Sequence, residues 1–231
     1  MRIDHLVFLV RDLDIAARQW TRRGYTVTSG GTHAGGWTHN KLVCLGDTSY
    51  IELIAFRSAE AAPHRWNRFR PFPGLIDFAV RVDDIHAAVV KLRKLGLDYS
   101  APSDAGRTRP DGVELRWRGA MPQTTSLGLP FLIEDVTPRN LRVPAGAARK
   151  HRNDATGIAS LDILTPDLGA ALPHFGALFG RAIELTRGAT IFQAGPGTRI
   201  TLRTPSRGRA AAVLALRGAG PFDWKPVKQP R

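Results

Sequence analysis

The stretch Ile3-Asp4-His5-Leu6-Val7-Phe8-Leu9-Val10-Arg11-Asp12-Leu13 decides the fold. It is a short apolar run that carries one histidine and ends in an Asp-Leu pair, and a segment of helical length follows it as far as Gly24. The same pattern returns at residues 75–85 and at residues 158–168, each time before a helical segment that also ends in glycine. A unit written three times sets the architecture of the whole chain.

The three stretches can be aligned on their closing aspartate, which places His5, Asp77 and Ser160 at one strand position. Two of the three copies therefore carry a metal-capable side chain there. Alternation along the first strand puts His5 on one face, and both faces are otherwise apolar. We therefore expect this strand to be covered on both sides.

The first unit, residues 1–60, predicts a strand, a helix and three further strands. Either Asp12 or Asp14 can cap the helix. Residues 29–36 are predicted to be a glycine-rich loop, and no helix follows them to bind phosphate. The last two strands of the unit run from about 38 to 45 and from 50 to 56.

A second unit, residues 74–137, repeats this order, and its polar residues 103–112 are predicted to be a loop over a cavity. A third unit, residues 155–216, repeats the strand and helix but lacks the later carboxylate, which indicates a degenerate, structural copy. The predicted fold class is α+β, built from repeated βαβββ units.

Glu52 lies in the middle of an otherwise apolar strand. A buried glutamate must be paired, protonated or bound to a cation, because an isolated buried carboxylate is too costly. A buried ion pair or an edge position is the structural alternative to a functional role. Glu134, near the end of the apolar run 129–135, is predicted to repeat Glu52 in the second unit.

The composition is that of a soluble globular protein, with 231 residues, 43% hydrophobic and 23% charged. No apolar run approaches the roughly 20 residues of a membrane-spanning helix, and the N-terminus lacks the order of a signal peptide. The single cysteine, Cys44, fits a reducing compartment, so we expect a cytoplasmic protein. The net charge of +13 is scattered rather than gathered into a basic helix, which favours a small, anionic substrate over nucleic acid.

Five segments carry a family resemblance, namely residues 5–13, 38–40, 45–47, 50–54 and 130–134. With the repeated βαβββ order, they resemble the vicinal oxygen chelate superfamily, the fold of glyoxalase I, extradiol dioxygenases and bleomycin-resistance proteins. They look most like the glyoxalase-like domain branch. The resemblance implies that two units pair into an open, incomplete barrel with a metal ion inside.

Carried over position by position, the resemblance implies that the metal ligands are His5, Glu52, Asp77 and Glu134, and that Glu52 or Glu134 moves a proton. The glyoxalase pattern has a histidine where this chain has Asp77. One histidine with three carboxylates suits Mn(II) or Fe(II), while zinc and nickel stay open. Asp77 could instead pair with Arg81, which would leave three protein ligands and open coordination positions.

His39 begins the third strand of the first unit and is the third candidate catalytic residue. With His5 and Glu52 it could complete the two-histidine, one-carboxylate arrangement of non-haem iron sites. The alternative is a strand-end histidine bonded to the backbone. Four other histidines lie in predicted loops or on a helix and receive low priority: His33, His64, His151 and His174.

The leading hypothesis is a metal-dependent enzyme, a lyase, isomerase or dioxygenase, that binds two adjacent oxygens of a small substrate. The competing hypothesis is a non-enzymatic small-molecule binding or antibiotic-sequestering protein on the same fold, with an aromatic-lined cavity. The sequence leaves open whether the third unit completes a barrel within the chain or forms the contact of a homodimer.

Overall fold

A computed structural model describes residues 1–60, 64–123, 128–165, 167–186, 188–204 and 212–217 of the chain. Its elements are, in chain order, β1 Arg2–Leu9, α1 Leu13–Arg22, β2 Thr28–His33, β3 Thr38–Cys44, β4 Tyr50–Phe56, η1 Asn67–Phe69, β5 Gly74–Arg81, α2 Ile85–Lys94, β6 Ser103–Thr108, β7 Glu114–Ala120, β8 Phe131–Asp135, α3 Arg139–Arg142, η2 Gly146–Arg149, β9 Gly157–Leu164, α4 Leu168–Phe179, β10 Glu184–Thr186, β11 Ala189–Gln193, β12 Arg199–Arg203 and β13 Ala212–Arg217. Among the described residues, no helix has the length and apolar character needed to span a membrane.

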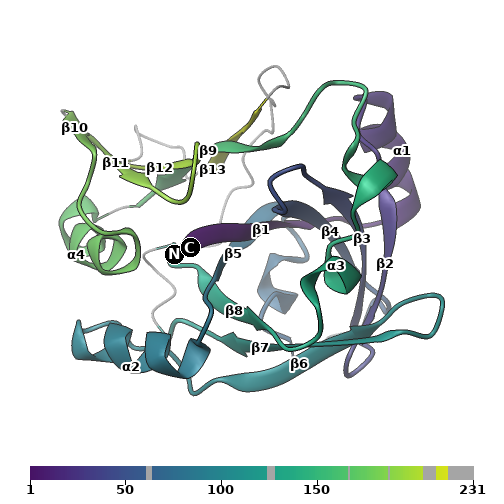
Figure 1. Cartoon of the computed structure of the whole chain (residues 1–231), viewed down its shortest axis with the longest axis horizontal. Coiled ribbons are helices and arrows are strands. Elements are labelled where there is room, and N and C mark those ends of the chain that lie inside the picture. Colours follow the sequence, from purple (N-terminus) through teal and green to yellow (C-terminus); the bar gives the residue numbers. More distant parts are fainter. Residues whose placement is uncertain (61–63, 124–127, 166, 187, 205–211, 218–231) are drawn as a thin grey trace.

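Eight strands close into a barrel in the order β1-β4-β3-β2-β6-β7-β8-β5 (Figure 1). β1 runs parallel to β4 and β5 runs parallel to β8, while β1 and β5 join the two halves in antiparallel fashion. The expected α+β class is confirmed, but the expectation of an open barrel was wrong. The ring closes where β2 meets β6, through the pairs Thr32–Thr108 and His33–Arg107.

Closure depends on β2 and β6, which lie in the two stretches that the sequence predicted to be loops, residues 29–36 and 103–112. Their glycine and polar residues show no apolar alternation, and so no strand was predicted there. Gly30 and Gly31 allow β2 to lie close to both of its neighbours. A Cβ atom on Gly30 would meet Asn40 Oδ1 at 1.9 Å, and one on Gly31 would meet the Thr108 carbonyl oxygen at 2.1 Å. Only glycine fits at these two places, so the residues that obscured the strand are the ones that close the barrel.

An aspartate caps the start of each of the three long helices. The apolar sides of these helices are buried in one continuous core. Asp12, Asp84 and Asp167 each accept a hydrogen bond from the backbone N–H three residues on, at 2.7, 2.9 and 2.8 Å. Of the two candidate caps of α1, Asp12 is therefore the cap. The core joins these helices to the outer face of the barrel, as where Trp20 packs edge-on against Phe8 with 5.6 Å between ring centroids.

A second sheet, in the order β10-β11-β12-β9-β13, lies beside the barrel with α4, at the upper left of Figure 1. The Ile3 N–H donates to the Ala194 carbonyl at 3.2 Å and ties this sheet to β1. The expected third unit, 155–216, spans this sheet, although residues 166, 187 and 205–211 of it lie outside the described residues. The order β9-α4-β10-β11-β12 matches the element order of the two barrel halves.

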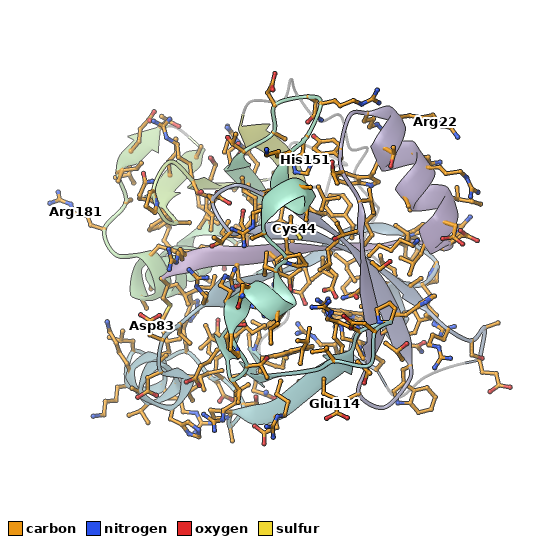
Figure 2. All side chains as sticks on the ribbon, turned by 45° about the vertical axis from the view of Figure 1, so that its right-hand side comes forward. Arg22, Cys44, Asp83, Glu114, His151 and Arg181 are labelled. Atoms are coloured by element: carbon orange, nitrogen blue, oxygen red, sulfur yellow. The ribbon has the colours of Figure 1, made fainter. Side chains whose placement is uncertain are left out.

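The connector after β8 packs back onto the first half of the barrel. His151 Nδ1 accepts from the Thr26 N–H and its Nε2 donates to the Cys44 carbonyl, both at 2.9 Å. Figure 2 shows Cys44 and His151 close together near the middle of the view. Burial lowers the pKa of His151, which suits a neutral ring that accepts at one nitrogen and donates at the other. Earlier in the connector, Arg139 of α3 donates to the Thr48 carbonyl in the β3–β4 turn, so α3 lies at that end of the barrel.

Candidate active site

His5 and Glu52 face each other inside the barrel from two parallel strands. His5 shares its face of β1 with Val7 and Leu9, which pack in the apolar cluster inside the barrel, and Glu52 shares its face of β4 with Ile54. His5 Nε2 lies 3.6 Å from Glu52 Oε2, and both side chains are buried. Strand alternation thus brings together two of the side chains that the sequence singled out.

Asp4 orients the ring of His5. His5 Nδ1 lies 2.7 Å from Asp4 Oδ1, and Tyr50 stacks on the imidazole with 4.5 Å between ring centroids. Burial raises the pKa of Asp4, but the Arg142 guanidinium and the His5 ring hold it well below its usual value, so Asp4 is a carboxylate. An ionised carboxylate only accepts hydrogen bonds. His5 Nδ1 therefore donates to Asp4, and Nε2 is the atom that faces Glu52.

Glu52 is kept ionised by the side chains around it. Asn40 Nδ2 donates to Glu52 Oε1 at 2.5 Å, and His33 Nε2 lies 3.2 Å from the same oxygen. Burial raises the pKa of Glu52, but the hydrogen bond and charge of His33, the charge of His5 and the Asn40 hydrogen bond lower it to about 2. Oε1 is therefore occupied, while Oε2 is the oxygen on the side of His5.

His33 is the site residue that the sequence reasoning missed. It lies at the end of β2, where its Nδ1 is 2.9 Å from Thr38 Oγ1 and its ring meets Trp117 edge-on at 6.1 Å. The His33 side chain is 18% exposed whereas that of Glu52 is 5% exposed, so His33 connects the site with solvent. The sequence could have pointed to His33 only if residues 28–33 had been predicted to form a strand. In such a strand, alternation turns the His33 side chain into the barrel.

Asp77 lies inside the barrel, but donors already surround its carboxylate. Oδ2 accepts from Arg65 Nη2 at 2.5 Å and from Trp66 Nε1 at 2.8 Å, and Oδ1 accepts from the Phe78 N–H at 2.9 Å. Burial raises the pKa of Asp77 in spite of the guanidinium beside it. The sequence offered Arg81 as the partner of Asp77; the structure pairs it with Arg65 instead.

Phe131 holds in the second half of the barrel the place that Glu52 holds in the first. Glu52 pairs across parallel strands with Val7, two residues after His5. Phe131 pairs in the same way with Ala79, two residues after the aspartate that aligns with His5. The second half therefore presents a phenylalanine ring, not a carboxylate, at this position.

The expectation that Glu134 repeats Glu52 was wrong. Glu134 lies three residues beyond Phe131, and an odd separation along a strand turns a side chain to the opposite face. On the outer face its Oε2 lies 3.6 Å from Arg118, its cross-strand neighbour on β7. The register of β8, which the apolar run alone does not reveal, decides this orientation.

The structure places His39 on the outer face of β3, away from the barrel interior. Its neighbour Asn40 points inward to Glu52, so alternation turns His39 outward. It lines an outer pocket of about 420 Å³ together with Lys41, and burial lowers its pKa. The two-histidine arrangement expected from His39 is therefore not formed, and His33 is the second histidine at Glu52.

The positions of the expected ligands show whether this site could bind the metal ion that the resemblance implies. Of the four expected ligands only His5 and Glu52 converge, because Asp77 is held by three donors and Glu134 faces outward. His5 and His33 approach different oxygens of Glu52. In the part of the chain that the structure describes, no group of three or more His, Cys, Asp or Glu side chains could hold a metal ion. The residues present do not fit a divalent ion.

Comparisons with known proteins agree with this architecture. A family model described as Glyoxalase-like domain matches residues 3–179. No curated protein matches the chain. A crystal structure of a hypothetical protein from Staphylococcus aureus aligns with a TM-score of 0.74 at 16% identity, over 88% of this chain and 86% of that one.

Two further solved structures are enzymes in the words of their descriptions. A fusion of a xylose isomerase-like TIM barrel with a 4-hydroxyphenylpyruvate dioxygenase aligns with a TM-score of 0.54 at 18% identity, over 89% of this chain and 32% of that one. Methylmalonyl-CoA epimerase from Streptomyces coelicolor aligns with a TM-score of 0.46 at 20% identity, over 59% of this chain and 96% of that one. At 18% identity, the likeness to the fusion protein shows a shared fold.

Proposed function

Because the chain belongs to the glyoxalase-like domain family of the vicinal oxygen chelate superfamily, as its strand motifs predicted, we propose that it is an enzyme that moves a proton on a small oxygen-bearing substrate inside the barrel. One observation carries the proposal: the buried carboxylate of Glu52 is held ionised between the imidazoles of His5 and His33. Titratable groups that perturb one another within a partly accessible interior are typical of active sites.

In this proposal Glu52 Oε2 takes the proton and His5 binds the oxygen that becomes negative. The 3.6 Å between His5 Nε2 and Glu52 Oε2 is longer than a direct hydrogen bond, so a substrate atom can approach both. Glu52 would remove a proton from a carbon next to a carbonyl group. His5, when it carries a proton on both ring nitrogens, would donate from Nε2 to the developing oxyanion.

His33 would set the basicity of Glu52. Its hydrogen bond to Oε1 contributes most to lowering the pKa of Glu52 against the effect of burial. A substrate oxygen that draws His33 away from Oε1 removes that hydrogen bond, and the pKa of Glu52 then rises towards the range in which a carboxylate is an effective base. The base would thus become stronger only while substrate is bound.

The proposal differs from the expected metal enzyme because the donor set does not fit a divalent ion. It keeps the predicted division of labour: residues 1–60 and 74–137 supply the site, and 155–216 form a structural third unit. It also keeps a cytoplasmic location. It includes a possible homodimer, and light scattering on the purified chain tests the homodimer.

Solvent deuterium exchange tests this function. The protein is incubated in D2O with a panel of small 2-oxo acids, 2-hydroxyketones and 1,2-dicarbonyls, and loss of the carbon-bound proton is followed by NMR. We expect exchange with at least one substrate class, and E52Q should slow it by about 10²- to 10⁴-fold. E134Q, the same chemical change on the outer face, should exchange at the wild-type rate. Exchange that is unaltered in E52Q, or absent across the panel, would overturn the proposal.

A non-enzymatic binding protein is the second candidate, and the apolar interior favours it. Trp66, Phe69 and Phe131 are buried in a cluster inside the barrel, next to His5. In that case a bulky organic ligand would raise the melting temperature while no substrate on the panel exchanges its protons.

A further inference from the structure

Arg107 lies inside the barrel beside the proposed base. It is the cross-strand partner of His33 between β2 and β6, and it is 4% exposed. Its Nη1 donates to Asn40 Oδ1 at 3.3 Å, and the amide of the same Asn40 donates to Glu52. One side chain therefore separates this guanidinium from the carboxylate that would move the proton.

The charge of Arg107 has no carboxylate partner among the described residues. Its second hydrogen bond goes from Nη2 to the Arg142 carbonyl at 2.8 Å, and its Nε is buried without an acceptor. Arg142 shows the contrast, since this equally buried guanidinium is paired with Asp4 at 2.9 Å and Asp135 at 2.5 Å. Burying a cation without a counter-ion is costly. Such an arrangement is expected where a ligand supplies the missing negative charge.

We propose that Arg107, with His33 beside it, forms the anion subsite of the active site and that the substrate carries a carboxylate there. The proposal rests on the proton-transfer function proposed above and names its substrate class. A guanidinium presents its N–H groups as a planar fork that matches a carboxylate. Arg107 lies one side chain from Glu52, so the carboxylate and the carbon that loses its proton are close neighbours in the substrate, as in a small 2-oxo acid.

Pyruvate and its neutral methyl ester test the charge requirement. Binding of both is measured by calorimetry, and deuterium exchange of both is measured by NMR, for the wild type and for R107Q, R107K and R118Q. Arg118 is the matched control, because it lies on β7 with its guanidinium near the outward Glu134. Charge-assisted hydrogen bonds lead us to expect that R107Q weakens pyruvate binding by about 10- to 100-fold. R107Q should weaken binding of the ester much less than binding of the acid. R107K should retain part of the pyruvate binding, and R118Q should bind both compounds as the wild type does.

The ratio of acid to ester distinguishes recognition from a structural role. If R107Q weakens acid and ester equally, or if R118Q weakens the acid as much as R107Q does, the anion subsite is wrong. Exchange that depends on Glu52 but not on Arg107 leaves the proposed function standing and removes the subsite. Pyruvate binding that depends on Arg107 without any exchange leaves the subsite standing and removes the function.

Discussion

Asp4 Oδ1 accepts a hydrogen bond from His5 Nδ1 at 2.7 Å and is also 2.9 Å from Arg142 Nη1, so one buried carboxylate orients the site histidine and neutralises a buried guanidinium. Asp4 therefore links α3, at the end of the barrel, to the site residue His5. The helix that carries Arg142, α3, thereby acts on His5 through Asp4. A change in Asp4 must alter both the stability of the chain and the geometry of the site.

We expect D4N to lower the free energy of unfolding by about 3 kcal/mol, because it breaks a buried ion pair and leaves Asp135 as the remaining carboxylate beside Arg142. D14N is the control, since Asp14 pairs with Lys41 at the exposed surface and its loss should change stability far less than the loss of Asp4. Urea unfolding at pH 7 measures both variants. A D4N effect no larger than that of D14N would contradict the role assigned to Asp4.

Removal of divalent ions should leave the protein unchanged. Three donors hold Asp77, Phe131 occupies the place of a second glutamate, and Glu134 faces outward. Among the described residues, the barrel interior therefore has no set of ligands for a strongly bound ion. After dialysis against EDTA we expect the wild-type melting temperature and deuterium-exchange rate. Elemental analysis that finds one ion per chain, lost in H5A, would show that this interpretation is wrong.

The places of His5 and Glu52 could be predicted because their strands are continuous apolar runs. In such a run alternation defines two faces without ambiguity, and a single polar residue in the middle must point to the interior of the fold or to a partner. For the cap of the first helix the sequence left Asp12 and Asp14 as candidates, and the hydrogen bond from the Ile15 N–H to Asp12 decides between them. The family motifs then supplied the order of the strands.

The positions of the other site residues depend on how the strands pair, and no local sequence pattern predicts that pairing. Glu134 ends an apolar run, as a second copy of Glu52 would. Which side of the sheet it faces depends on the register of β8, whose pairing with β5 begins at Phe131. His33 and Arg107 sit in glycine-rich or polar strands that have no apolar face to reveal them. Arg65 reaches Asp77 from a proline-bearing connector, and only the folded chain brings the two together.

His33 and His39 offer a matched pair of variants. The two histidines lie on neighbouring strands, one beside Glu52 and the other on the outer face of the barrel. We expect H33Q to slow deuterium exchange by about 10-fold or more, because it removes the imidazole that lies beside Arg107 in the proposed anion subsite. H39Q should retain the wild-type rate. The reverse ranking of these two variants in the exchange assay would return His39 to the site.

Glu52 should make the stability of the chain depend on pH in the acid range. Against the effect of burial, His33, His5 and Asn40 lower its pKa from 4.5 to about 2 in the folded protein. The unfolded chain therefore binds more protons between these values, so the stabilisation is complete above pH 4.5 and is lost as the pH falls towards 2. The loss amounts to about 3 kcal/mol, and E52Q should not show it. H33Q should narrow the window, because its lost hydrogen bond raises the folded pKa of Glu52. Urea unfolding from pH 6 downwards measures the three proteins, and parallel curves for wild type and E52Q would refute the lowered pKa of Glu52 as the source of the acid sensitivity.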